Sequence, residues 1–156
     1  MKKQIIKYSC ILSSICILYF ISTNLLGISG DEIIGWFGYL PYIFVIYFGI
    51  NLSPILFSTY KSKFMFGTKV GGIGAIVSSL FMFVYLKFVS NLMIETVIKN
   101  QIALLDPSSS SYETTVETIT NTITPNFYLI FGIIVGIILS LIFSSIIPLI
   151  PNFLKK

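Results

Sequence analysis

The sequence predicts an all-α membrane protein with four transmembrane helices and an amphipathic helical extension between the third and the fourth. Three observations predict this class. Four apolar runs are each long enough to cross about 30 Å of hydrocarbon. Hydrophobic residues make up 55% of the chain and charged residues only 10%, whereas a typical soluble domain has about 25% charged residues. Finally, lysines and acidic residues lie in different connectors between the runs.

The first apolar run covers residues 8–28 and follows the lysine-rich start Met1-Lys2-Lys3. An apolar run of about 20 residues is longer than the core of a secretory signal peptide. No clear cleavage site of small residues follows, because Gly27-Ile28-Ser29-Gly30 matches that pattern poorly. We therefore expect an uncleaved transmembrane helix, with a removed secretory signal as the alternative.

The second apolar run covers residues 33–57 and contains Pro41 and Pro54. A proline removes one helical hydrogen bond, but neighbouring groups in a membrane bundle can bond the carbonyl that it leaves free. We therefore expect one helix that is kinked at the two prolines.

A basic connector is expected over residues 58–69, before the third apolar run at residues 70–89. Its lysines, Lys61, Lys63 and Lys69, alternate with aromatic residues, which favours a segment lying at the membrane surface. We interpret these lysines as cytoplasmic topology determinants and lipid-headgroup anchors. A docking site for an acidic cytoplasmic partner is the alternative.

Residues 90–124 form the outward amphipathic segment, for which we expect a two-helix hairpin broken at Asp106-Pro107. Ser110 and Glu113 have the spacing of a capping box at the start of its second helix. The many threonines leave a short strand over residues 118–124 as the alternative.

The fourth apolar run, residues 127–150, contains no charge. Thr124 and Pro125 are typical of a helix N-cap followed by its first turn. Residues 1–156 therefore form a single integral membrane domain.

The charges of the connectors separate by sign. One side of the predicted spans holds the two terminal segments and residues 58–69, with eight lysines and no acidic residue. The other side holds all six acidic residues, together with Lys87 and Lys99. Cytoplasmic connectors are enriched in lysine. The sequence thus predicts a multi-pass protein of the cell inner (cytoplasmic) membrane with both termini in the cytoplasm.

The residue types needed for chemistry inside a membrane are missing from the sequence. There is no histidine, no acidic residue lies inside a predicted span, and Cys10 and Cys16 are too far apart along one helix to bridge. We expect no catalytic residue, metal site, cofactor or enzymatic activity. The lysines are scattered rather than gathered on one face, which argues against a nucleic-acid partner.

Lys87 is the one ionisable residue inside a predicted span. Such residues are functional candidates, for example as contacts for a substrate or an ion. Because Lys87 lies near the outer end of its span, its ammonium group can also extend to the lipid headgroups. We favour the anchor and keep the substrate or ion contact as the alternative.

Small residues recur four positions apart in the third and fourth spans, a spacing that lets two helix backbones approach closely. They predict helix-packing faces, used either among the four helices of one chain or between two copies in a homodimer. The candidates are Gly71, Gly74, Ala75, Ser78, Gly132 and Gly136.

Several segments resemble, in their order along nearly the whole chain, a known family of small membrane proteins. They are Met1-Lys2-Lys3, Glu32-Ile33-Ile34-Gly35, Phe48-Gly49-Ile50, Lys63-Phe64-Met65-Phe66-Gly67 with Gly71, and the proline-led last span at residues 125–150. On these residues the chain resembles the Bacteroidota membrane protein family known as domain of unknown function 4199. The resemblance implies four helices in a bacterial inner membrane, and it implies no activity.

These features favour an accessory or scaffold component that acts within the lipid bilayer by contact with another membrane protein or with itself. The alternative is a small channel or carrier subunit for an ion or small solute, with a path lined by serines of the spans. Serines in helices usually bond back to their own backbone, and no convergent set is visible in the sequence.

Overall fold

The computed structural model describes residues 1–52 and 57–150, and within these residues every regular element is a helix and no strand occurs. Four helical segments are long and apolar enough to cross a membrane, which confirms the predicted all-α class with four candidate spans. They are Lys2–Leu25, Ile33–Asn51, Tyr60–Phe88 and Pro125–Leu149.

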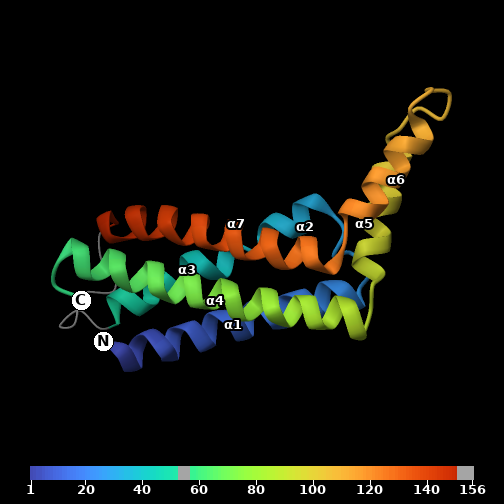
Figure 1. Ribbon diagram of the computed structural model, residues 1–156. Helices are drawn as coiled ribbons and strands as arrows, with labels where there is room; N and C mark the ends of the chain where they lie inside the picture. The colour runs from blue at the N-terminus through green and yellow to red at the C-terminus, as the bar shows by residue number, and fades with distance from the viewer. Residues whose placement is uncertain (53–56, 151–156) are drawn as a thin grey trace.

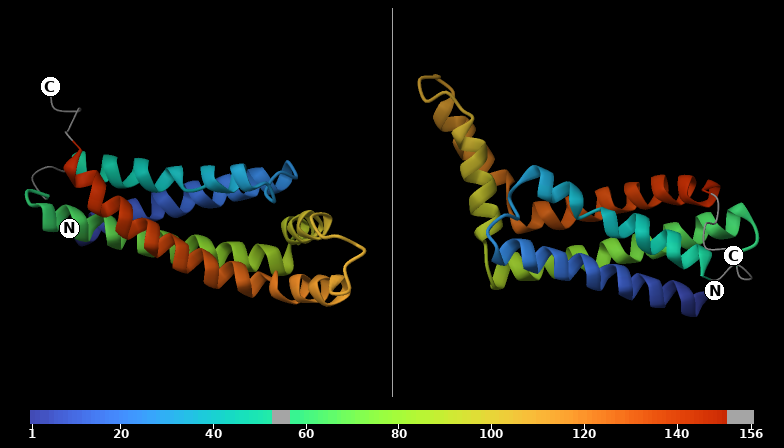
Figure 2. Two further views of the ribbon diagram at one scale, coloured as in Figure 1. Left: turned by 90° about the horizontal axis from the view of Figure 1, so that it is seen from above. Right: turned by 180° about the vertical axis from the view of Figure 1, so that it is seen from behind.

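The four segments lie side by side as an antiparallel bundle (Figure 1 and Figure 2). Figure 1 shows the starts of α1 (Lys2–Leu25) and α4 (Tyr60–Phe88) at the same end of the bundle as the end of α7 (Pro125–Ile146). We call this the lysine end, because Lys2, Lys3, Lys7, Lys61 and Lys63 lie there. The opposite end carries a projecting pair of helices and is called the hairpin end.

Helix α1 begins at Lys2, earlier than the predicted residue 8, and ends in a Schellman turn. Gly27 has a positive φ of 71°, which glycine adopts without a steric penalty. Its N–H donates to the Asn24 carbonyl at 3.1 Å, and the Ile28 N–H donates to the Thr23 carbonyl at 3.0 Å. These two bonds satisfy carbonyls that the helix end would otherwise leave free.

The second span is broken into α2 (Glu32–Phe37) and α3 (Leu40–Asn51). The helix is interrupted at Pro41 as expected, but by a break rather than a kink: α2 ends at Phe37, whose carbonyl the Pro41 ring would meet in a continuous helix, and Pro41 lies in the first turn of α3. Gly38 and Tyr39 instead donate three residues back, to Gly35 and Trp36. Pro54, the other expected kink, lies outside the described residues.

Helix α4 begins at Tyr60, so the connector predicted over residues 58–69 is largely helical, which corrects that prediction. Thr59 and Ser62 form a capping box: each side-chain oxygen accepts from the other residue's N–H, at 3.2 and 3.3 Å. With 29 residues, α4 is about 43 Å long and exceeds the hydrocarbon thickness of about 30 Å. It is therefore longer than a helix needs to be to cross the hydrocarbon.

Residues 90–124 contain a hairpin of α5 (Leu92–Ala103) and α6 (Tyr112–Thr122), so the helical alternative is the one observed and the strand is not. The predicted capping box is wrong, because α6 is capped by Ser111 without a side-chain bond. The Ser111 hydroxyl lies 3.0 Å from that of Ser109 instead. Threonines of α6 bond back to carbonyls four residues earlier, for example Thr118 to Thr114 at 2.8 Å, which lets a threonine-rich segment stay helical.

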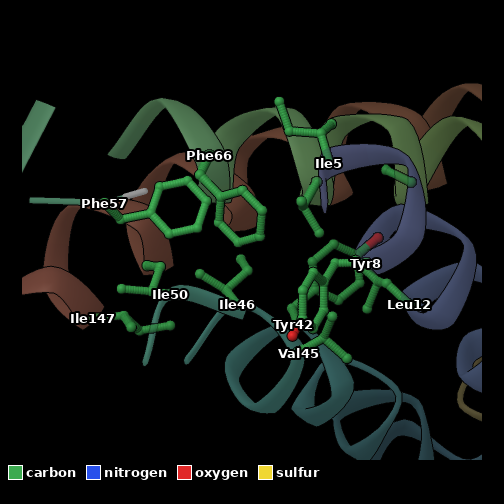
Figure 3. Close-up of a cluster of buried hydrophobic side chains, with 12 residues drawn as sticks. Ile5, Tyr8, Leu12, Tyr42, Val45, Ile46, Ile50, Phe57, Phe66 and Ile147 are labelled. Atoms are coloured by element: carbon green, nitrogen blue, oxygen red, sulfur yellow. The ribbon is translucent and has the colours of Figure 1, made fainter. Parts of the chain in front are cut away.

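Figure 3 shows the buried core, whose residues come mainly from the start of α1, the start of α4 and the end of α3, nearer the lysine end of the bundle. Phe66 of α4 is fully buried and packs against Tyr8 and Phe57, with ring centroids 5.7 and 4.5 Å apart. A Cβ placed on Gly49 of α3 would lie 2.7 Å from the Phe66 ring. Glycine at this position therefore allows α3 to approach the aromatic cluster.

Candidate functional site

The small residues of α4 and α7 meet each other along the bundle. A Cβ placed on Gly71 would lie 2.6 Å from the Cβ of Ser140, and one placed on Gly136 would lie 2.5 Å from the Cβ of Ala75. The contacts recur every four residues on both helices, in opposite order because the helices are antiparallel. The facing pairs are Gly67 with Ser144, Gly71 with Ser140, Ala75 with Gly136, and Ser79 with Gly132.

Two other packing candidates of α4 lie away from this row. A Cβ on Gly74 would lie 2.6 Å from a methyl group of Leu12, so Gly74 packs against α1. The Ser78 hydroxyl donates to the Gly74 carbonyl of its own helix at 2.8 Å. The small-residue faces of α4 are thus in contact with α1 and α7 of the same chain, an arrangement that favours packing within the chain over homodimerisation.

Sequence reasoning missed the partners of this row, namely Ser79, Ser140 and Ser144. We interpreted the serines of the spans as polar groups that could line a path. In the structure these three are small residues at the contact between α4 and α7. The signal was present, since Ser140 and Ser144 continue the four-residue spacing of Gly132 and Gly136.

Serine hydroxyls in the spans bond mainly to their own helices. Ser13 donates to the Ser9 carbonyl at 2.8 Å, and Ser140 donates to the Gly136 carbonyl at 2.5 Å. The Ser144 hydroxyl is buried and has no hydrogen-bond partner among the described residues. These side chains lie in helix contacts rather than along an open path.

A polar contact joins α1 to α4 near the hairpin end. The Asn24 amide group donates to the Tyr85 hydroxyl at 3.3 Å, and the Ser29 hydroxyl donates to the Asn24 side-chain oxygen at 3.3 Å. Asn24 is only 2% exposed, so these bonds satisfy a polar group that would be costly to bury alone.

The three lysines proposed as anchors lie in the first turns of α4. Lys61 and Lys69 are exposed, and Lys63 is half-buried. Because α4 starts at Tyr60, these lysines are arranged along a helix rather than along an extended connector.

Lys87 lies in the last turn of α4 and is exposed. Its ammonium nitrogen lies 5.3 Å from the ring centroid of Phe83 and 5.5 Å from that of Phe88. Cation–π contacts of this length and the negative end of the helix dipole both favour a cation here. Both features stabilise the ammonium group at this end of α4.

The α5–α6 hairpin is attached to the bundle through a short contact with the loop after α1. A Cβ on Gly30 would lie 2.8 Å from the Thr96 methyl group and 3.4 Å from a Val97 methyl group. At the hairpin tip, the Ser108 hydroxyl and N–H both donate to the Asp106 carboxylate, at 2.7 and 2.9 Å. These two bonds lower the pKa of Asp106 below its usual value.

In the residues that the structure covers, no group of three or more histidine, cysteine, aspartate or glutamate side chains is placed to hold a metal ion. Cys10 is exposed and Cys16 half-buried, and both are free thiols.

Comparison of the chain with protein-family models, curated proteins and solved structures found no match. The resemblance to the Bacteroidota family stays a prediction.

Proposed function

We propose that the protein is an accessory or scaffold component of the membrane that acts by contact rather than by chemistry. The observation that carries this proposal is the α5–α6 hairpin, which leaves the bundle and runs across its axis (Figure 1 and Figure 2). The core cluster of the four-helix bundle contains no residue of α5 or α6.

The direction of the hairpin supports a partner in the same bilayer. If the four spans lie along the membrane normal, an arm that runs across them lies over the membrane surface beside the bundle. The 12 residues of α5 reach about 18 Å, enough to meet a neighbouring membrane protein at the level of the headgroups.

The remaining surfaces of the bundle suit a purely lipid environment. Large apolar side chains of α7 are exposed, for example Ile130 at 59% and Ile134 at 52%. The small-residue faces, which promote contacts between helices, pack inside the chain instead. The hairpin is therefore the part of the chain that we assign to a partner.

We also propose the orientation in which the lysine end faces the cytoplasm of a bacterial cell and the hairpin end faces outward. The separation of charges between the two ends supports it, because cytoplasmic segments are enriched in lysine. In this orientation the membrane is the inner membrane, as the resemblance to the Bacteroidota family implies.

The alternative function, a small channel or carrier subunit, lacks a supporting contact in a single chain. Ser140 and Ser144, two serines of the fourth span, face glycines of α4 and are fully buried. A path would have to form between copies of the chain.

The test is purification of the tagged full chain from its native membrane in mild detergent, with mass spectrometry of co-purifying proteins. We expect a stoichiometric membrane-protein partner that is lost when residues 106–117 are replaced by a neutral linker. The lipid-facing substitution Ile134→Ala serves as the control and keeps the partner. A partner that stays bound to the linker variant would contradict the role of the hairpin.

If the chain comes out alone, flux through reconstituted vesicles decides the alternative. Flux above that of empty vesicles, altered by Lys87→Ala, would favour a channel or carrier subunit.

A further inference from the structure

An apolar groove opens on the side of the bundle between α1 and the broken pair α2–α3. Its volume is about 510 Å³, within the range of roughly 300–1,000 Å³ that small-molecule sites occupy. Its lining includes Ile15 and Tyr19 from α1 and Phe37, Leu40 and Phe44 from the broken pair. The groove lies in the half of the bundle nearer the hairpin end, since it spans the second half of α1 and the start of α3.

The break between α2 and α3 is held beside this groove by one hydrogen bond. Because Gly38 donates to Gly35 rather than to Ile34, the Ile34 carbonyl loses its helical partner. The Tyr19 hydroxyl of α1 donates to that carbonyl at 2.5 Å. Such a bond replaces the one lost at a helix break in a membrane, and it keeps α2 against α1 at the groove.

A second hollow continues the groove along α2. It is lined by Ile33, Trp36, Phe37 and Leu40, so it shares Phe37 and Leu40 with the first. Trp36 lies at the edge of this hollow and is 71% exposed. Tryptophan is typical of the interface between hydrocarbon and headgroups. The two hollows together form one apolar track along α2 and the first half of α3.

We propose that this track binds one acyl chain of a phospholipid. In a bilayer crossed by the four spans, the candidate occupants of the track are an acyl chain and a transmembrane helix. Close helix contacts in membranes use small residues, whereas the groove is lined by isoleucine, leucine, valine, proline, phenylalanine and tyrosine side chains. A thin, flexible hydrocarbon chain can follow such a track, and a helix backbone cannot approach it closely.

An acyl chain gains no hydrophobic energy by moving from the bilayer into an apolar groove. Its retention must come from dispersion contacts with side chains that the fold holds in place. The bound lipid is therefore distinguished from bulk lipid by staying with the protein when the bilayer is removed. This inference does not depend on the proposed accessory function.

The first test is native mass spectrometry of the full chain in mild detergent after incubation with a phosphatidylcholine. We expect one phospholipid per chain, lost in the double variant Ile15→Phe/Leu40→Phe, which fills the groove from two side chains that are about 40% exposed. The matched control Ile134→Phe/Ile138→Phe enlarges exposed side chains of α7 and keeps the lipid. No bound lipid in the unmodified protein, or equal retention in both double variants, would overturn the proposal.

The second test needs no substitution, because Trp36 is the only tryptophan of the chain. The protein is incubated with a phosphatidylcholine that carries bromine on its acyl chains and is then washed into detergent. We expect Trp36 emission to stay quenched relative to the same preparation with unbrominated lipid. Equal emission would overturn the proposal.

Discussion

Gly71 and Gly72 are neighbours in α4, yet the structure gives them opposite surroundings. A Cβ on Gly71 would lie 2.6 Å from the Cβ and 3.4 Å from the Cα of Ser140, whereas a Cβ on Gly72 would meet nothing within 4 Å. The Cα of Ser140 is a backbone atom and the backbone fixes the position of its Cβ, so a change of rotamer cannot relieve the first contact. One helix position therefore requires glycine and the next does not.

We expect Gly71→Ala to lower the free energy of unfolding by about 1–3 kcal/mol, the usual effect of overpacking. Gly72→Ala, the matched control, should leave it unchanged or raise it by up to about 1 kcal/mol through helix propensity. Denaturant unfolding in mixed micelles, followed by circular dichroism, measures both. The double variant Gly71→Ala/Ser140→Gly should recover part of the loss, and equal effects of the two alanines would contradict the α4–α7 contact.

Tyr19 provides a second residue-scale test, at the helix break. In Tyr19→Phe the Ile34 carbonyl loses the hydroxyl that donates to it at 2.5 Å. The bond is part-buried, and an unsatisfied buried carbonyl costs about 1–3 kcal/mol, so we expect a loss of stability of about 1 kcal/mol and faster amide exchange in α2. Tyr128→Phe, the control, removes a tyrosine hydroxyl from α7 and leaves the helix break unchanged, and it should have a smaller effect in the same measurement.

At the scale of elements, the α5–α6 hairpin depends on a small contact with the loop after α1. Gly30 lies against Thr96 and Val97, and a side chain there would displace α5. The four-helix core involves neither α5 nor α6. The hairpin should therefore detach without unfolding the bundle.

We expect Gly30→Leu to increase amide hydrogen exchange in residues 92–103 and 112–122, with exchange in α4 and α7 unchanged. Gly35→Leu is the control, because a Cβ at Gly35 meets nothing within 4 Å. Hydrogen-exchange mass spectrometry of the protein in micelles measures both variants. If exchange rises equally in α4 and α7, the hairpin and the bundle form one cooperative unit instead.

At the scale of the whole molecule, the two ends of the bundle differ in charge. The lysine end carries Lys2, Lys3 and Lys61, and the hairpin end carries Asp31, Glu95 and Glu113. This difference is the basis of the proposed orientation.

A cysteine-labelling experiment tests that orientation. In a background with Cys10→Ala and Cys16→Ala, we expect Ser109→Cys to react with a membrane-impermeant maleimide from outside the cytoplasmic membrane. Lys61→Cys should react only after permeabilisation, because it lies at the other end of the bundle. Labelling of both positions from outside would contradict four alternating spans, and the reverse pattern would invert the proposed orientation.

Hydropathy and charge are properties of short segments, and by themselves they determined the all-α class, the four candidate spans and the amphipathic hairpin at residues 90–124. Thr124 was also correct as an N-cap from its local pattern, and its hydroxyl accepts from the Phe127 N–H at 3.3 Å. These features depend on the cost of placing polar backbone groups and charges in hydrocarbon. An apolar helix avoids that cost by itself, without contacts to any other helix.

Only the tertiary structure decided how the helix break is stabilised and which faces meet. At the break after Phe37, Tyr19, on another helix, donates to the carbonyl that the break leaves free. Gly71 faces Ser140 because α4 and α7 pack antiparallel in one register. Each of these contacts joins residues far apart in the sequence, and a spacing of four along one helix does not specify the helix that packs against it.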